Sequence, residues 1–312
     1  MKILSYHPLS KAQTDKIKSL GDIDLTILSA GEDPIPLLKN TEIYFSEFRF
    51  THDLLQAAPK LKWLQVSSAG VNNVPLKELE QRKVLLTNVR GMHGDCISEY
   101  VLAMMFALNR KLPYVLKNQQ ASKWQKFGQS MLKDKTLGII GLGGIGQVLA
   151  DKASALGMHV IGLRNSSKPA EHVERIYQHD HLNDFMAASD YVAVCCPLTP
   201  ETTGLVSAAA IAAMKPTASL INIARGPVVD EEALIAALQN KRIASAALDV
   251  FKIEPLPVSS PLWQLDNVII TPHVAGDMED YSERAAAIFV ENVEHYMKHE
   301  RLRGLVDYKL GY

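Results

Sequence analysis

The chain has 312 residues, of which 47% are hydrophobic and 21% are charged, and its formal net charge is -1. These values exclude a small disulfide scaffold and predict a globular protein, and the length predicts two domains. There is no basic stripe for nucleic acid and no apolar run of about 18 residues for a membrane span, so we expect neither partner. The N-terminal apolar run is too short for a signal peptide, which predicts a cytoplasmic protein.

Cysteine and histidine offer no obvious metal or disulfide framework. Cys96 stands apart, and the adjacent pair Cys195–Cys196 lacks the CxxC spacing, so we interpret all three as reduced thiols. A metal ion at His172, His179 and His181 is conceivable, but no matching cysteine or carboxylate cluster accompanies them. A solvated loop is the preferred interpretation, and we expect no metal.

Short β-rich apolar runs alternate with helix-like stretches, which predicts an α/β protein with parallel sheets. No repeat of about 20–50 residues is visible. The strands expected in the first third are Ile3–Tyr6, Leu25–Leu28, Ile43–Ser46, Leu64–Ser67 and Val84–Asn88.

The pattern changes after Gly94, where a long stretch is apolar on one side. It predicts one or two consecutive helices that begin at Asp95 as N-cap and break or kink at Pro113. A polar segment, Ala121–Lys135, follows and contains Trp124.

A second and more regular βα series occupies the rest of the chain. Its expected strands are Leu137–Ile140, His159–Leu163, Tyr191–Cys195, Ser219–Ile223, Ala246–Val250 and Val268–Thr271. The sequence thus predicts two doubly wound, Rossmann-like parallel-sheet units joined by helical segments.

The first strand of the second series runs directly into a glycine motif, GLGGIG at 141–146, and a helix-like stretch, Gln147–Leu156, follows. This strand–turn–helix context is the one that dinucleotide binding requires. Gly141 allows a tight turn, Gly143 allows a pyrophosphate to approach the backbone, and Gly146 allows close helix packing. Amides at the helix start, including those of Gly144 and Ile145, would face the phosphates.

The next strand ends at Arg164, where a dinucleotide-binding protein usually has an acidic residue for the ribose 2′-hydroxyl. No acidic residue occurs between Asp151 and Glu171, so a small misalignment does not recover one. Arg164, with Asn165 and Ser166, supplies donors that suit a 2′-phosphate. We therefore predict NADP(H) as the preferred cofactor with NAD(H) possible. A solvated basic loop is the alternative.

Three residues that could carry chemistry each follow a predicted strand: Arg225, Glu254 and His273. Ligands of an open parallel sheet bind outside the carboxyl ends of its strands, so all three are expected at the binding edge. Each is a weak signal alone, but together with the glycine motif they describe a site.

With these residues, the chain resembles the D-isomer-specific 2-hydroxyacid dehydrogenase family over nearly its full length. The segments that carry the resemblance are GLGGIG at 141–146, CCPLTPETTGL at 195–205, MKPTASLINIARGPVVDEEAL at 214–234, AALDVFKIEPLP at 246–257 and TPHVAG at 271–276.

The resemblance implies a role for each catalytic candidate. Arg225 would hold the substrate carboxylate and polarise the keto oxygen. His273 would protonate that oxygen as hydride arrives, and Glu254 would orient the imidazole and favour its protonated form.

The resemblance also implies contacts around these groups. The loop Ser68-Ala69-Gly70 would offer backbone N–H groups to the substrate, and Asn72-Asn73 replaces the Asp-Asn pair of many relatives. The implied cofactor contacts are Pro197, Thr202, Ala224, Asp249 and Gly276. For Trp124 and Trp263, burial in the core is weighed against a place at an interface or in the substrate pocket.

In the implied architecture the substrate-binding domain is flavodoxin-like and discontinuous, comprises residues 1–95 and 283–312, and includes the last helix, Glu283–Glu300. The NAD(P)-binding domain is residues 96–282. A homodimer would form through an arm near 121–135.

The sequence therefore predicts an NADPH-dependent reductase of small 2-oxo acids such as glyoxylate or hydroxypyruvate, producing D-2-hydroxy acids. One alternative is a branched-chain or aromatic 2-oxo acid reductase on the same scaffold. An alternative of another class is a nucleotide-sensing binding protein that resembles the dehydrogenase-like corepressors.

Overall fold

The structure is a computed structural model that describes residues 1–47 and 49–311. The chain divides into two compact units. Unit 1 comprises Met1–Met92 and Met278–Tyr312, and unit 2 is the continuous segment His93–Asp277. These boundaries differ by a few residues from those expected at 95/96 and 282/283.

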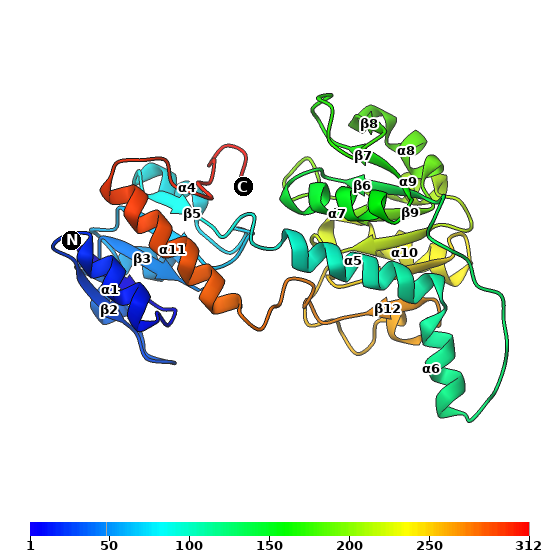
Figure 1. The fold of residues 1–312 in the computed structure, drawn as a ribbon, viewed down its shortest axis with the longest axis horizontal. Coiled ribbons are helices and arrows are strands. Elements are labelled where there is room, and N and C mark those ends of the chain that lie inside the picture. Colours follow the sequence, from blue (N-terminus) through cyan, green and yellow to red (C-terminus); the bar gives the residue numbers. More distant parts are fainter. Residues whose placement is uncertain (48, 312) are drawn as a thin grey trace. The chain divides into compact units, whose positions relative to one another are not determined.

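Unit 1 is built on a five-stranded parallel sheet in the order β2-β1-β3-β4-β5 (Figure 1). Its two inner strands at Ile43–Ser46 and Trp63–Val66 are buried on both faces, whereas the edge strand at Asp24–Ile27 is mostly exposed. The elements are β1 (Lys2–Ser5), α1 (Lys11–Ser19), β2 (Asp24–Ile27), α2 (Ile35–Leu38), β3 (Ile43–Ser46), α3 (His52–Ala57), β4 (Trp63–Val66), α4 (Leu76–Gln81), β5 (Leu85–Thr87) and α11 (Tyr281–Met297).

The last helix, α11, returns to the sheet formed by the first third of the chain. Phe289 on α11 stacks on Phe45 of β3 with ring centroids 4.6 Å apart, and it also contacts the fully buried Trp63. Beyond the helix, Leu305 forms an antiparallel bridge with Thr87 of β5. The two ends of the chain therefore share one core.

Unit 2 is built on a seven-stranded parallel sheet in the order β12-β11-β10-β9-β6-β7-β8. Helices cover both faces, and a separate apolar cluster lies on each (Figure 1). The elements are α5 (Gly94–Asn109), α6 (Leu112–Gln120), β6 (Thr136–Ile140), α7 (Gly144–Ala155), β7 (His159–Leu163), β8 (Arg175–Tyr177), η1 (His179–His181), α8 (Leu182–Ala188), β9 (Tyr191–Val194), α9 (Ala208–Ala213), β10 (Ser219–Asn222), η2 (Gly226–Val228), α10 (Glu231–Gln239), β11 (Ser245–Leu248), η3 (Pro261–Gln264) and β12 (Val268–Ile270).

The two parallel sheets confirm the predicted fold class. Every expected strand is present within two residues of its predicted ends, but β8 was not predicted from the sequence. The prediction that Asp95 caps the first helix of unit 2 is wrong. The cap of α5 is His93, which makes no side-chain capping bond, and Asp95 lies in the first turn.

The helical stretch breaks before Pro113 rather than at it. Lys111 has a positive φ of 52° and separates α5 from α6, and Pro113 occupies the first turn of α6. A proline is tolerated there because the amide it lacks would have no helical partner. The helix α7 begins at Gly144, inside the glycine motif, and α11 begins at Tyr281 and ends at Met297.

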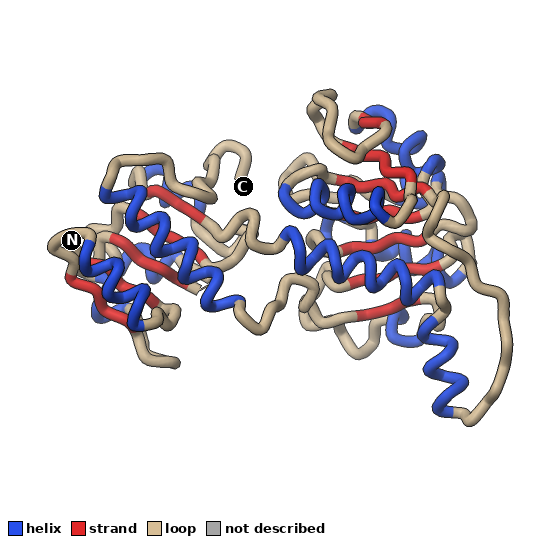
Figure 2. Tube along the Cα trace, in the orientation of Figure 1, coloured by secondary structure: helices blue, strands red, loops and turns tan. Residues whose placement is uncertain are grey.

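The helix α6 and the segment after it extend away from the sheet of unit 2, and the segment has no helix or strand through residue 131 (Figure 2). No described residue of α6 is buried. Trp124 is 95% exposed and Trp263 is 49% exposed, so the alternative that these tryptophans lie in the core is wrong.

The described residues contain no group of three or more side chains arranged to hold a metal ion, and the three cysteines are free thiols. Among the helices that the structure describes, none combines the length and apolarity that a bilayer crossing needs.

Candidate active site

The glycine motif forms the turn between β6 and α7. Gly141 has a positive φ of 96°, and a Cβ there would lie 2.8 Å from Cys196 Cα, so both the turn and the packing require glycine. A Cβ on Gly146 would overlap the carbonyl oxygen of Gly141. Gly143 is the N-cap of α7, and a Cβ there would meet no atom within 4 Å. The motif therefore packs tightly at its two outer glycines and leaves open space at Gly143.

The first turn of α7 includes the amides of Gly144, Ile145 and Gly146. Such amides have no acceptor within their own helix, and the helix dipole favours an anion there. Beside this turn, Thr202 Oγ1 donates a hydrogen bond to the carbonyl of Pro197 (2.7 Å) and accepts one from Thr199 N (2.7 Å). These bonds fix the loop that follows β9.

Arg164 lies at the carboxyl end of β7, and its side chain folds over its own loop. Nε donates to the Ser166 carbonyl at 2.9 Å, and Nη2 donates to the carbonyls of Lys168 and Pro169. Ser166 Oγ accepts from Lys168 N at 3.3 Å, so its own proton is left for another acceptor. The guanidinium thus closes a loop whose exposed residues include Asn165 and Ser166.

Arg225 follows β10 and is held by the end of that strand. Asn222, which is 2% exposed, bonds both sides of the turn: its Oδ1 accepts from Ala224 N (3.1 Å) and its Nδ2 donates to the Arg225 carbonyl (3.3 Å). A Cβ on Gly226 would overlap the backbone at Phe251, so this turn packs directly against the segment after β11. Burial lowers the pKa of the Arg225 guanidinium, whereas Glu254 raises it.

Glu254 and His273 form a hydrogen-bonded pair. His273 Nδ1 lies 2.7 Å from Glu254 Oε2, while Glu254 Oε1 accepts from Phe251 N at 2.9 Å. The carboxylate is therefore fixed at both oxygens. Because Nδ1 is engaged, Nε2 is the ring nitrogen left to face a substrate. The His273 side chain is 45% exposed.

The loop that carries His273 is fixed by Asp249, the residue after β11. Asp249 is 1% exposed, and its carboxylate accepts hydrogen bonds from Thr271 Oγ1 (2.6 Å), Val274 N (2.9 Å) and Ala275 N (2.9 Å). Its backbone carbonyl accepts from His273 N at 2.9 Å. One buried residue therefore bonds the loop on both sides of the imidazole.

The predicted substrate loop belongs to unit 1 and follows β4. Ser68 Oγ donates to the Gly70 carbonyl (2.7 Å), and Asn88 Nδ2 donates to the Ala69 carbonyl (2.7 Å). Within the described part of the chain, the amides of Ala69, Gly70 and Val71 donate to no partner. The loop is thus held by its carbonyls while three consecutive N–H groups remain available for an anion.

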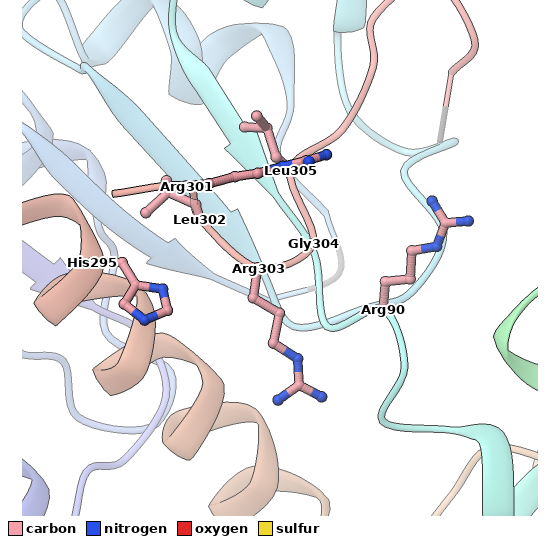
Figure 3. A pocket seen from close by; sticks show the side chains of 7 residues that line it. All are labelled: Arg90, His295, Arg301, Leu302, Arg303, Gly304 and Leu305. Carbon is pink, nitrogen blue, oxygen red and sulfur yellow. The ribbon is translucent and has the colours of Figure 1, made fainter. Parts of the chain in front are cut away.

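Unit 1 also contains a cavity of about 400 Å³ with a basic lining, which includes Arg90, Arg301 and Arg303. Their guanidinium groups point in different directions (Figure 3). Arg303 Nη1 lies 3.4 Å from Glu291 Oε2. The three cations do not converge on one point, and we place no chemistry in this cavity.

The structure brings most of the predicted residues of unit 2 to one edge of its sheet. The glycine turn, Arg164 and Pro197 follow β6, β7 and β9, and the catalytic candidates follow β10, β11 and β12. Sequence reasoning missed Asn222, Thr271 and Tyr100, which support this edge. Asn222 and Thr271 lie within the family-like segments, and Tyr100 lies in the stretch after Gly94 that predicts a helix, but no pattern in the sequence indicates that any of the three supports the site.

A glycine turn at the start of a helix and a carboxylate–imidazole pair at one edge of a parallel sheet are features that NAD(P)-dependent oxidoreductases share. The family model described as "D-isomer specific 2-hydroxyacid dehydrogenase, NAD binding domain" matches residues 102–275. The chain belongs to the D-isomer specific 2-hydroxyacid dehydrogenase family.

Two curated relatives extend the similarity beyond that domain. A D-3-phosphoglycerate dehydrogenase of Methanocaldococcus jannaschii is 31% identical over 313 residues, which cover 98% of this chain and 59% of the relative. The chain thus spans less than two thirds of that relative. A glyoxylate/hydroxypyruvate reductase B of Yersinia pestis is 35% identical over 253 residues, 78% of this chain and 77% of the relative.

Two solved structures resemble the whole chain. A D-isomer specific 2-hydroxyacid dehydrogenase family protein from Aeromonas salmonicida has a TM-score of 0.87 and 34% identity, covering 98% of this chain and 99% of that one. A D-isomer specific 2-hydroxyacid dehydrogenase from Xanthobacter autotrophicus, in complex with NADPH and MES, has a TM-score of 0.85 and 31% identity, covering 100% and 99%.

Proposed function

We propose that the protein reduces small 2-oxo acids such as glyoxylate or hydroxypyruvate to D-2-hydroxy acids with NADPH, and that His273 is the proton donor. The observation that carries the proposal is the 2.7 Å pair between His273 Nδ1 and Glu254 Oε2 at the same sheet edge as the glycine turn. The similarity to the Yersinia glyoxylate/hydroxypyruvate reductase supports the substrate class.

The proposed mechanism assigns one task to each side chain. Bound reduced nicotinamide supplies the hydride that adds to C2 of the keto acid. Arg225 binds the carboxylate and polarises the keto oxygen, since its planar fork matches such oxygens. His273 Nε2 gives its proton to that oxygen, and Glu254 orients the imidazole through its hydrogen bond to Nδ1. In the reverse direction, neutral His273 takes the proton back.

The residues of unit 2 fit a dinucleotide. Open space at Gly143 leaves room for a pyrophosphate, and the amides of Gly144, Ile145 and Gly146 face that space as donors. Thr202 and Pro197 would line the adenosine and phosphate region, and Ala224 and Gly276 the nicotinamide. Asp249 Oδ2 accepts one hydrogen bond, which leaves a lone pair for the carboxamide N–H.

The preference for NADP(H) over NAD(H) is proposed from the loop after β7. Arg164 uses Nε and Nη2 for its own loop, so Nη1 is the nitrogen that would reach a 2′-phosphate, together with the hydroxyl of Ser166 and the side chain of Asn165. The related Xanthobacter dehydrogenase was solved with NADPH. NAD(H) would bind through the same amides without the 2′ contacts.

In unit 1 the loop Ser68-Ala69-Gly70 is proposed to bind the substrate carboxylate, because its amides are free of other partners within the described chain.

A homodimer is proposed through α6 and the arm at 121–135. That surface presents Leu112, Leu116 and Trp124 at 44%, 50% and 95% exposure. The cytoplasmic location stays a prediction.

One assay tests the proposal directly. Purified protein is mixed with NADPH and a panel of 2-oxo acids, from glyoxylate and hydroxypyruvate to branched-chain and aromatic acids, and absorbance at the nicotinamide band is followed. We expect turnover that is fastest with the two small acids. Tight NADPH binding without turnover of any acid would overturn the enzymatic role in favour of nucleotide sensing. A preference for the bulky acids would support the alternative reductase.

A further inference from the structure

Three side chains, joined in series by hydrogen bonds, connect helix α5 to the loop that carries His273. The hydroxyl of Tyr100, on α5, is hydrogen-bonded to Thr271 Oγ1, the first residue after β12. Thr271 Oγ1 in turn lies 2.6 Å from Asp249 Oδ1. The three residues come from three separate elements of unit 2.

The direction of these hydrogen bonds follows from their chemistry. An ionised carboxylate can only accept, so the Thr271 hydroxyl donates its single proton to Asp249. The lone pairs of Thr271 Oγ1 are then the acceptor for the Tyr100 hydroxyl. Burial raises the pKa of Tyr100 to about 12, so this phenol retains the proton that it donates.

Asp249, the last of these three side chains, is hydrogen-bonded to the backbone around His273. Besides Thr271, the Asp249 carboxylate accepts from the amides of Val274 and Ala275, each at 2.9 Å. His273 itself has a positive φ of 57°. Residues with side chains adopt this conformation uncommonly, and a fixed set of hydrogen bonds helps to hold it. The bonds to Asp249 are such a set.

Helix α5 holds Tyr100, the first of the three side chains, in place. It has 16 residues, and Val101 and Met105, on its buried side, belong to the same apolar cluster that Tyr100 packs against. We propose that Tyr100 is a positioning residue for His273, which through Thr271 and Asp249 holds the imidazole in its working orientation. The inference rests on the proposed role of His273 as proton donor.

The substitution Tyr100→Phe removes the hydroxyl and keeps the ring that packs in the cluster. We expect kcat to fall about three- to tenfold, which is the factor that one neutral hydrogen bond typically contributes. The KM values for NADPH and for the 2-oxo acid should change less than twofold. An equal fall in NADPH affinity would show a general defect of the unit and overturn the proposal.

A double-mutant cycle tests whether Tyr100 acts through Thr271. Thr271→Val keeps the shape of the side chain but removes the link, and its effect on kcat should exceed that of Tyr100→Phe. Adding Tyr100→Phe to Thr271→Val should then have no further effect, because the hydroxyl has lost its acceptor. If the effects of the two substitutions on kcat were additive, Tyr100 would not act through Thr271, and the proposal would be overturned.

A matched control is Tyr191→Phe. Tyr191 belongs to the same apolar cluster and is 7% exposed, but it lies at the start of β9, opposite the active-site edge, and its hydroxyl bonds to no described residue. We expect kcat within twofold of the parent. A loss as large as that of Tyr100→Phe would assign both effects to packing.

Amide hydrogen exchange gives a readout that does not depend on the substrate. In Tyr100→Phe the amides of Val274 and Ala275 should exchange about three- to tenfold faster than in the parent, while those within α7 keep their parent rates. Unchanged exchange at Val274 and Ala275 would overturn the positioning role, whatever the enzyme assays show. If the parent turns over no 2-oxo acid but these amides still exchange faster in Tyr100→Phe than in the parent, only the proposed function is contradicted.

Discussion

Glu254 holds His273 with one carboxylate oxygen and the amide of Phe251 with the other, at 2.7 and 2.9 Å. The acidic partner therefore has a fixed position before any substrate arrives. Preorganisation of this kind lowers the reorganisation that a proton transfer would otherwise require.

Removal of the imidazole tests the proposed proton donor. In His273→Ala we expect kcat to fall about 10²- to 10⁴-fold, the usual contribution of a positioned general acid. The dissociation constant for NADPH should stay within about threefold, because the glycine turn and the Arg164 loop are untouched. Steady-state kinetics and fluorescence titration with NADPH measure the two quantities. A variant whose kcat stays near that of the parent, or whose loss of activity is explained entirely by weaker NADPH binding, would contradict the assignment.

The Arg164 loop predicts a switch of cofactor preference. In the parent we expect kcat/KM for NADPH to exceed that for NADH by tens- to a thousandfold, since one or two charge-assisted hydrogen bonds from Arg164 and Ser166 contribute about 1.5–3 kcal/mol each. Arg164→Asp should erase or reverse this ratio by repelling a 2′-phosphate. The measurement is kcat/KM with both cofactors at a fixed 2-oxo acid concentration.

Because Arg164 also closes its own loop, Arg164→Lys is the matched control. It keeps the charge but loses the fork that bonds three carbonyls. We expect this variant to retain a preference for NADPH at a reduced ratio. Equal efficiency of the parent with NADPH and NADH would refute the assignment of the loop.

Two glycines of the motif should respond differently to alanine. A Cβ on Gly146 overlaps the Gly141 carbonyl, so Gly146→Ala should lower both thermal stability and NADPH affinity. Gly143→Ala meets no protein atom within 4 Å, so it should leave the melting temperature unchanged and weaken NADPH binding at least tenfold. Calorimetry and binding titration separate the two effects. Equal destabilisation by both variants would show that Gly143 serves packing rather than the cofactor.

Unit 1 contains a buried histidine that should make its stability sensitive to acid. His7 is 7% exposed, and burial lowers its pKa from 6.5 to about 4, against a smaller opposing effect of a backbone hydrogen bond with Ser46. The unfolded chain binds a proton below pH 6.5, whereas the folded chain resists it until about pH 4. Stability is therefore lost as the pH falls through this window, by about 2 kcal/mol at pH 5.

The comparison of the parent with His7→Gln isolates this contribution. Between pH 7.5 and pH 5 the parent should lose about 2 kcal/mol more unfolding free energy than the variant. Trp63 is fully buried in unit 1, while Trp124 and Trp263 are exposed, so the change in tryptophan emission on denaturation reports mainly on unit 1. Parallel pH profiles for the two proteins would argue against a neutral buried imidazole.

The fold could be predicted from the sequence because its strands are short apolar runs that alternate with helices. The strand β8 was missed because its three residues, Arg175–Tyr177, contain only one side chain that is fully buried. The N-cap of α5 was misplaced because an acidic residue favours the first turn of a helix as well as its cap, and Asp95 lies in that turn.

The candidate site could be predicted from the sequence only in part. Residues at the ends of strands follow from the topology, because parallel strands bring their carboxyl ends to one edge. The bond between Tyr100 and Thr271 joins positions 171 residues apart, and no local pattern encodes it. Likewise, the composition of the loop after β7 showed its charge but not that Arg164 folds back onto three carbonyls.

The bridge between Thr87 and Leu305 has a consequence for synthesis of the protein on the ribosome. Unit 2 is one uninterrupted segment, so it has all its residues available once Asp277 has left the exit tunnel. Residues 1–92 of unit 1 precede unit 2, but unit 1 lacks α11 and its last bridge until residues 281–305 have been synthesised. The core of unit 1 therefore stays incomplete while all of unit 2 is synthesised, and nascent chains that stall before residue 289 would expose the apolar face that Phe289 covers.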